Sequence, residues 1–520
     1  MAFWSDGYFT NTEYTEGYYK EISPLMMNLN LTLAGIDIGN EHDITPKNDF
    51  SYLELGYGMG VSITLNAATS NGIFYGTDFT PTHTHKANIY ANGLDNIKLY
   101  NDSFEELLER LNDTKPEFDY IVFHGIFSWI SRENQNIILE IIRKFLKSGG
   151  IVYNSYNCMP GWAPKMPIRE IFSLHNKCYV NANMAPNESM MIFTNFLKSI
   201  SETNPLYLQN NQIAQSLIKQ LVDSKEYNYL GHEYLNSNWE IFYFHEIADR
   251  MQNIAKCEFI TTGEILEHFH EWTLRKEWVN FLNNIQDKIL KEQLKDIYLN
   301  RQFRKDLYSK GVAYTNHNAA KNKLLNTKFA LTTHKNNFSE KMHFALGEGT
   351  LKRDKYDAIL EYLEAQSYRS KTGWEIIEKC KFEFQELMSI IAILIQQGMV
   401  SPAQTINDTM KNRARIYNEN IIKNKEKSIL NSPYIASPAT CSAIAISDIH
   451  RFMLGFYMQG TTKENELISK TIAKLKELDS KPIRNGKTLT TSTEIKQEIT
   501  LMAKDFIKST DIFKNLGIID

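Results

Sequence analysis

Short apolar runs and helical stretches alternate from residue 50 to residue 156. The apolar runs are FSYLEL (50–55), GIFYGTD (72–78), IKLYND (97–102), FDYIVFHG (118–125) and GGIVYNSY (149–156), and the helical stretches are 60–70, 84–94, 103–112 and 132–147. Strands that alternate with helices of about ten residues are typical of βαβ units, which form a parallel sheet. Because the crossovers are right-handed, a ligand is expected at the carboxyl ends of these strands.

The remainder of the chain predicts a long insertion and a second domain. Residues 238–265 favour a helix followed by a strand, and a further strand is expected near residue 303. We therefore predict an α/β domain over 1–318, with an N-terminal arm at 1–49 and a helical insertion at about 163–300. Residues 313–340 are polar and rich in asparagine, which favours a linker or an exposed segment. A mainly helical domain is expected over 319–520.

Composition narrows the classes of partner. The net charge of the 520 residues is −4, which gives no electrostatic reason to expect nucleic acid or an anionic membrane. The five cysteines include no CxxC pair, so neither a zinc knuckle nor a disulfide framework is indicated. The N-terminus lacks the order of a signal peptide, and no apolar run is long enough for a membrane span. The expected setting is the reducing cytoplasm.

Three glycines follow the first predicted strand in the sequence ELGYGMG. Glu54, Gly56, Gly58 and Gly60 would end that strand and open the next helix. Glycine permits a tight turn and a close approach of the backbone to a ligand. The motif alone suits a dinucleotide, S-adenosylmethionine or a plain turn.

Acidic residues end the next two strands. Asp78 can accept hydrogen bonds from both hydroxyls of a ribose, and Asp102 with Ser103 can receive an adenine amino group. The sequence places no evident lysine or arginine against Glu54, Asp78 and Asp102, so a phosphate would be repelled and the cationic S-adenosylmethionine favoured. The alternative is that Asp78 and Asp102 are helix N-caps.

Several longer stretches then resemble one family. They are FDYIVFHGIFSWIS (118–131), SYNCMPGW (155–162), YLGHEYLNSNWEIFYFHEIADRM (229–251), FRKDLYSKG (303–311) and YIASPATCSAIAIS (434–447). The chain resembles class I S-adenosylmethionine-dependent methyltransferases, and within them the rickettsial-type protein lysine methyltransferases that carry a methyltransferase regulatory domain. The resemblance is strong over 14–310 and weaker beyond. The arm keeps Tyr14 and Tyr19 of the family pattern, and Cys441 stands where glycine is frequent.

The resemblance implies a Rossmann-like class I methyltransferase sheet with helical insertions and a winged-helix-like C-terminal domain. It implies transfer of a methyl group from S-adenosylmethionine to lysine side chains of a protein, typically a bacterial surface protein before export. Homodimers are expected from the resemblance as well. Tyr14, Tyr19 and His124 are expected among the residues that bind the cofactor.

Aromatic and polar residues near the fourth and fifth strands are candidates for the transfer step. We expect Trp129, Tyr156 and Trp162 around the transferring methyl, where their faces stabilise an ammonium group. Asn157 and His124 would align the acceptor nitrogen or receive its proton. Each of these aromatic residues and the histidine can instead be a packing residue. No metal is expected, since the histidines lack convincing ligand spacing.

Three functions stay open on the sequence. A protein lysine methyltransferase is favoured, because the insertion and second domain suit a large substrate. A methyltransferase for a small metabolite is the second, and a protein that binds the cofactor without turnover is the third.

Overall fold

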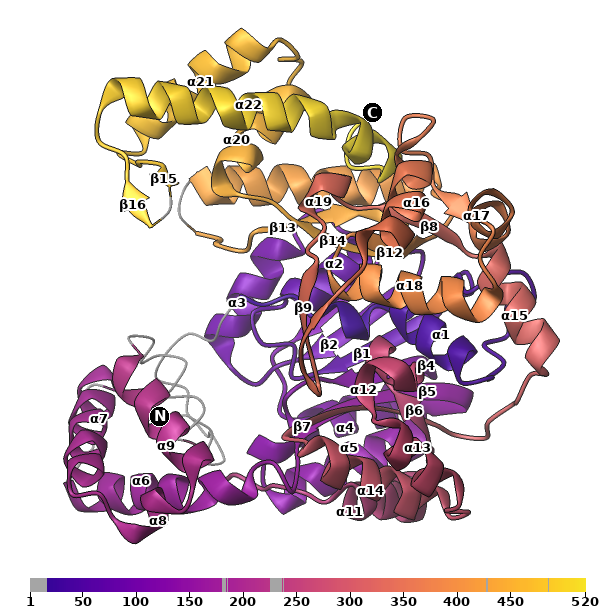
Figure 1. Cartoon of the computed structure of the whole chain (residues 1–520), viewed down its shortest axis with the longest axis vertical. Helices are drawn as coiled ribbons and strands as arrows, with labels where there is room; N and C mark the ends of the chain where they lie inside the picture. The colour runs from indigo at the N-terminus through magenta and orange to yellow at the C-terminus, as the bar shows by residue number, and fades with distance from the viewer. Residues whose placement is uncertain are drawn as a thin grey trace.

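The structure is a computed structural model that describes residues 16–179, 184, 186–224, 236, 238–426, 429–484 and 486–520. A seven-stranded sheet lies at its centre, with strands in the order β3-β2-β1-β4-β5-β7-β6 (Figure 1). The strands are β1 (Ser51–Leu55), β2 (Ile73–Thr77), β3 (Ile97–Tyr100), β4 (Phe118–Phe123), β5 (Leu146–Asn157), β6 (Glu258–Thr262) and β7 (Phe303–Ser309). The first five are parallel, and β7 runs antiparallel to both β5 and β6. The expected Rossmann-like α/β sheet is therefore confirmed.

Four helices connect the parallel strands, close to the predicted positions. They are α2 (Val61–Ala68), α3 (Pro81–Tyr90), α4 (Phe104–Thr114) and α5 (Arg132–Phe145). Serine caps start two of them: Ser103 accepts from the Glu106 N–H at α4, and Ser131 accepts from the Asn134 N–H at α5. The strand order reverses between β1 and β4, which is where ligands bind in open sheets of this kind.

The predicted helical insertion at about 163–300 divides into two parts. Its first part forms a lobe to one side of the sheet (Figure 1), made of η3 (Ala163–Lys165), α6 (Met166–Tyr179), α7 (Pro186–Glu202), α8 (Leu206–Gln209) and α9 (Gln212–Asp223). Its second part returns to the sheet and contributes β6, in agreement with the helix followed by a strand that is predicted over 238–265. The helices of that part are α11 (Phe244–Arg250), η4 (Met251–Ala255), η5 (Ile265–His268), α12 (His270–Thr273), α13 (Lys276–Asn283) and α14 (Lys288–Leu299).

The region beyond residue 316 is mainly helical and also holds short sheets. Its helices are α15 (His317–Asn326), η6 (Lys335–Asn337), α16 (Arg353–Glu364), α17 (Gly373–Cys380), α18 (Phe384–Gln396), α19 (Asp408–Glu426), η7 (Pro438–Thr440), α20 (Asp448–Met458), α21 (Glu464–Glu477) and α22 (Ser492–Asn515). Its strands are β8 (Lys328–Leu331), β9 (Lys341–Phe344), β10 (Gly347–Thr350), β11 (Lys371–Thr372), β12 (Val400–Ala403), β13 (Tyr434–Ser437), β14 (Ser442–Ala445), β15 (Ile483–Arg484) and β16 (Lys487–Thr488).

The expected linker at 313–340 is wrong. Asn316 caps α15 through the Ala319 N–H, and β8 is the middle strand of the sheet β11-β8-β12. Leu325 and Phe329 are fully buried in the core of this region. The segment is polar overall, so its few buried apolar positions were not recognised. The expected domain boundary at 318 falls inside α15.

The N-terminal arm joins the sheet domain to the C-terminal region. It continues as η1 (Lys20–Ile22) and α1 (Pro24–Leu33), and α1 is almost wholly buried. Ser23 donates a hydrogen bond of 2.7 Å to the Cys441 carbonyl, and Tyr18 Oη lies 2.8 Å from Ser442 Oγ. Cys441 has a φ of 48°, which lies in the left-handed region that favours glycine.

None of the helices in the described ranges is long and apolar enough to cross a membrane.

Candidate methyl-donor site

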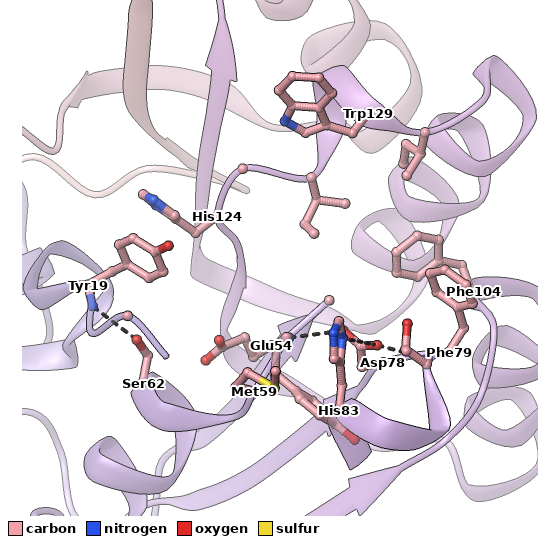
Figure 2. Close-up of a pocket in the computed structure, with 18 of the residues that line it drawn as sticks. Tyr19, Glu54, Met59, Ser62, Asp78, Phe79, His83, Phe104, His124 and Trp129 are labelled. Atoms are coloured by element: carbon pink, nitrogen blue, oxygen red, sulfur yellow. Dashed lines mark hydrogen bonds and ion pairs between the residues drawn. The ribbon is translucent and has the colours of Figure 1, made fainter. Parts of the chain in front are cut away.

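A cavity lies where β1, β2, β3 and β4 end, with the arm closing one side (Figure 2). The predicted residues that line it are Tyr19, Glu54, Gly56, Gly58, Asp78, Asp102, Ser103, His124 and Trp129. Most of the candidate cofactor residues are therefore gathered at one place. Tyr14 lies outside the described residues.

The glycine motif makes the floor of this cavity. Gly56, Gly58 and Gly60 have φ values of 71°, 57° and 77°, which other residues adopt at a cost. A side chain at Gly56 would collide with Ile126 on the cavity wall. Gly60 does not line the cavity. Its missing side chain leaves room for Ala87 of α3.

The Glu54 carboxyl is buried beneath the glycine turn, with 5% of the residue exposed. Tyr52 Oη donates a long hydrogen bond of 3.4 Å to it, and no cation pairs with it among the described residues. Burial raises the pKa of Glu54 to about 8. The site therefore holds a carboxyl group that a nearby ammonium would stabilise in its charged form.

The Asp78 carboxylate is held in place by two backbone amides and one side chain. Gly58 N and Thr80 N each donate to it over 2.9 Å, and His83 Nδ1 lies 3.1 Å from its Oδ1. Thr80, not Asp78, is the N-cap residue of α3, so the alternative N-cap interpretation is wrong for Asp78. A carboxylate has about four acceptor positions, which leaves one for a ligand hydroxyl without any rearrangement.

Asp102 has a partner that sequence reasoning missed. Arg110, two turns along α4, donates to both carboxylate oxygens over 2.6 and 3.1 Å. The expectation that no arginine offsets the acidic residues is therefore wrong at this position. Ser103, and not Asp102, caps α4. An Asp followed by Arg at i+8 was the available signal, because residues eight apart lie on one face of a helix.

Tyr19 and His124 lie against each other at the other end of the cavity (Figure 2). Their ring centroids are 3.8 Å apart with an interplanar angle of 29°. His124 Nδ1 lies 3.0 Å from Tyr153 Oη and 3.1 Å from Ser155 Oγ. Burial lowers the pKa of His124 to about 3, so its ring is neutral at physiological pH.

Trp129 lines the cavity with 8% of the residue exposed. Its ring centroid is 6.2 Å from that of Trp239, and Trp239 is 5.1 Å from Trp162. Trp162 does not line the cavity. It carries the Lys165 ammonium 5.2 Å from its ring centre, so it belongs to a tryptophan cluster behind Trp129.

Tyr156 and Asn157, like Trp162, do not line the cavity. Tyr156 is fully buried and donates a hydrogen bond of 2.6 Å to Asp306. Asp306 in turn pairs with the buried Arg304 at 2.9 Å. Asn157 is buried too, and its backbone N–H donates to Ser128 Oγ over 2.9 Å. Successive side chains of a strand point to opposite faces, so Tyr156 and Asn157 leave β5 on opposite sides, and neither lines the cavity.

Other residues that line the cavity are not predicted from the sequence. Ser62 accepts the Tyr19 N–H over 3.0 Å and so fixes the arm, while Phe79 and Phe104 form an apolar side (Figure 2). Ser62 and Phe79 follow the glycine motif and Asp78 closely, which was the signal that could have found them.

Among the described residues, no group of three or more histidine, cysteine, aspartate or glutamate side chains is arranged to hold a metal ion.

Sequence comparisons match two families. Residues 46–240 match the methyltransferase domain, and residues 226–310 match the predicted methyltransferase regulatory domain. An uncharacterised protein of Synechocystis is 30% identical over 512 residues, which is 97% of each chain. An uncharacterised protein of Rickettsia prowazekii is 26% identical over 298 residues, which cover 56% of this chain and 50% of that protein.

Structure comparison gives a match over nearly the whole chain. PKMT2 from Rickettsia typhi in complex with AdoHcy superposes with a TM-score of 0.69 and 20% identity, covering 96% of this chain and 99% of that one. The similarity establishes a common fold over both the sheet domain and the C-terminal region.

Proposed function

Since the chain belongs to the S-adenosylmethionine-dependent methyltransferases that carry a methyltransferase regulatory domain, we propose that it methylates lysine side chains of a protein. One observation carries the choice of a nitrogen acceptor. Tyr19, His124 and Trp129 are among the aromatic residues that line the cavity, and the histidine is neutral. Such a wall suits an amine that must lose its charge before it reacts.

The residues of the cavity fit the cofactor. Gly56 and Gly58 leave their backbone open to close approach. Asp78, already oriented by two amides, would accept from a ribose hydroxyl, and Asp102 with Ser103 would meet the adenine end. Glu54 would face the ammonium group of the methionine moiety of the cofactor. That positive charge would be the partner that the Glu54 carboxylate otherwise lacks among the described residues.

When bound, S-adenosylmethionine supplies an electrophilic methyl on a sulfonium, so no nucleophilic residue of the protein is required. The chain positions the acceptor nitrogen and excludes water. The acceptor amine would lose its proton to solvent before it enters the site, and its lone pair would then form the N–C bond as the S–C bond breaks, with S-adenosylhomocysteine as the leaving group. A lysine has a reference pKa of ~10.4, and burial among aromatic rings lowers it. His124 is a poor base, so we assign it to alignment by hydrogen bonding through Nε2.

The choice of a protein as the acceptor is supported by the similarity to rickettsial PKMT2 and by the added C-terminal region. The identity of a bacterial surface protein as the substrate stays a prediction from the resemblance. The homodimer is also a prediction, and sedimentation of the purified chain would test it.

Labelled S-adenosylmethionine, incubated with the purified protein and total bacterial protein, tests the proposal. We expect a labelled protein band that yields methyl-lysine on hydrolysis, and no label with the Asp78→Ala variant. The exposed Asp113→Ala on α4 is the matched control. Label in small molecules alone would favour a metabolite methyltransferase. Binding of S-adenosylhomocysteine without any transfer would favour a non-catalytic binding protein.

A further inference from the structure

A second, wider cavity adjoins the donor cavity. Its volume is about 900 Å³, within the ~300–1,000 Å³ typical of ligand pockets. Tyr19 and His124 line both cavities. The other walls include residues of the arm, the start of β7, the start of β12, β14 and the end of α22. The C-terminal region therefore forms much of the wall of a cavity next to the cofactor site.

One strand of the C-terminal region runs along this second cavity. Residues 442–447, which are β14 and the two residues after it, all line the cavity. Among the described residues, β14 pairs with β13 alone, in a sheet of two strands. Because a strand has two edges that can pair, the edge of β14 away from β13 can take a further strand. We call it the open edge of β14.

The register shows which backbone groups point to the open edge. Ile446 N donates a hydrogen bond of 2.9 Å to the Pro433 carbonyl. In an antiparallel pair the hydrogen-bonded positions alternate, so Ile444 also directs its N–H and C=O to β13, and Ala445 directs its own away from β13. Ala445 is exposed and lines the cavity. Its backbone is therefore placed to pair with an added strand.

Two neighbouring strand edges are protected, in contrast to this one. On the far edge of β13, the buried Asn418 side chain accepts from Ala436 N over 2.7 Å and donates to its carbonyl over 3.1 Å, so it takes the place of a neighbouring strand. The edge strand β12 carries Pro402, which has no N–H to donate. Since natural proteins commonly protect their edge strands, the open edge of β14 points to a partner.

We propose that the acceptor protein binds in the second cavity as an extended segment, which adds a strand to the open edge of β14 and directs its lysine at His124. This proposal rests on the proposed function, because it assigns one cavity to the donor and the other to the acceptor. In strand addition, main-chain hydrogen bonds give the affinity, and the side chains of alternate residues give the specificity. The occupant is therefore a lysine-bearing segment that is extended when it binds.

The arm connects the open edge of β14 to the donor cavity. The Tyr18 hydroxyl meets this strand at its start, 2.8 Å from Ser442 Oγ and in hydrogen-bonding contact with the Ala443 backbone. The next residue, Tyr19, stacks on His124 with ring centroids 3.8 Å apart. A segment along β14 would therefore lie beside the histidine that both cavities share.

The residues around His124 in the second cavity suit a lysine side chain. Phe303 is 37% exposed and lies edge-on to His124, with ring centroids 5.9 Å apart. Lys305, the nearby cation of β7, is paired with Glu21 and Glu264 at 2.7 Å each. An incoming amine therefore meets aromatic rings, which favour an alkylammonium, and a lysine already held by two carboxylates.

Substitutions at Ala445 test the open edge directly. Ala445→Pro removes the N–H that an added strand would use, and it leaves the bonds to β13 in place because Ala445 makes none of them. Ala445→Val is the matched control, since it adds similar bulk and keeps the N–H. Should Ala445→Pro fail to fold, Ala445→Lys is the second variant, because lysine is a residue with which natural edge strands resist pairing.

The readout is kcat/KM for total bacterial protein, from initial rates with labelled S-adenosylmethionine at rising protein concentration. We expect Ala445→Pro to lower it about tenfold and Ala445→Lys about fivefold, mainly through KM, because a main-chain contact is lost. Ala445→Val should stay within twofold of the wild type. Affinity for S-adenosylhomocysteine, measured by calorimetry, should stay within twofold in all three.

Equal rates for Ala445→Val and the two edge variants would overturn the proposal, and so would a loss of S-adenosylhomocysteine affinity that matches the loss of rate. The wild type separates this result from the proposed function. If the wild type forms methyl-lysine, the proposed function stands whatever the variants do. If it labels no lysine, both proposals are overturned.

Discussion

The two adjoining cavities differ in how the chain builds them. The donor cavity takes its walls from residues between Gly17 and Asn134, at the ends of four neighbouring strands and in the arm. The second cavity takes its walls from residues between Tyr18 and Phe513. A site made of strand ends follows from local motifs, whereas a site between distant regions depends on how those regions pack. Substitutions in the donor cavity should therefore change cofactor affinity, and substitutions in the second cavity should change the KM for the acceptor.

Asp78→Ala should have the largest effect and should act on the donor side. Hydrogen bonds to a charged group contribute ~1.5–3 kcal/mol each, so loss of the carboxylate should weaken S-adenosylhomocysteine binding roughly 100-fold. Calorimetry measures the affinity, and circular dichroism checks that the fold survives. An affinity equal to that of Asp113→Ala would remove Asp78 from the cofactor site.

Trp129→Ala should lower kcat about tenfold, because a lost cation–π contact is worth ~0.5–2 kcal/mol. Its effect on S-adenosylhomocysteine affinity should be under threefold, which would place Trp129 at the transferred methyl. Single-turnover rates with labelled protein acceptor measure the first quantity. An unchanged rate would make Trp129 a packing residue of the tryptophan cluster.

The buried Glu54 should make donor binding depend on pH. With a pKa of about 8, Glu54 is protonated in the free folded protein at neutral pH, and it must ionise to pair with an ammonium. Affinity for S-adenosylhomocysteine should therefore rise with pH up to about 8, by at most about tenfold per pH unit. Calorimetry in buffers of different ionisation enthalpy should show proton release, and Glu54→Gln should abolish it.

The raised pKa of Glu54 also determines how the free energy of unfolding changes with pH. Between pH 4.5, the ordinary pKa of a glutamate, and about pH 8, the folded state holds a proton on Glu54 that the unfolded state has released. The Glu54 contribution should therefore lower the free energy of unfolding as pH rises through this window. Glu54→Gln should flatten that part of the profile, and a profile identical to the wild type would contradict the assignment.

Phe303→Ala tests the second cavity and should change the KM for the acceptor rather than the affinity for the cofactor. We expect the KM for the protein acceptor to rise about fivefold, with S-adenosylhomocysteine affinity unchanged, because the ring faces His124 from the acceptor side. A loss of cofactor affinity without a change in KM would reverse the assignment of the two cavities.

Tyr156→Phe should have the smallest effect on activity, since Tyr156 lies in neither cavity. Loss of its hydrogen bond to Asp306 should lower the free energy of unfolding by about 1–2 kcal/mol. Thermal unfolding measures this change, and kcat should stay within twofold. A large fall in kcat at unchanged stability would support Tyr156 as a catalytic candidate.

The contacts that the sequence did not predict have a common physical origin. Arg110 pairs with Asp102 across two helical turns, and Tyr156 bonds to Asp306 across two paired strands. The pattern of apolar residues in one sequence indicates whether a segment is a helix or a strand, but it does not show which distant residue a side chain will contact. The polar stretch at 313–340 misled for the same reason, because a few buried positions such as Phe329 decide its place in the fold.

The sequence by itself determined the alternation of strands and helices, the glycine turn, and the acidic residues at the strand ends, because these depend on periodicity and backbone conformation within short segments. Tertiary structure alone decided that the arm and the C-terminal region enclose a second cavity and that Tyr19 rests on His124. Residues hundreds of positions apart meet there through packing of buried apolar surface, which no local pattern records.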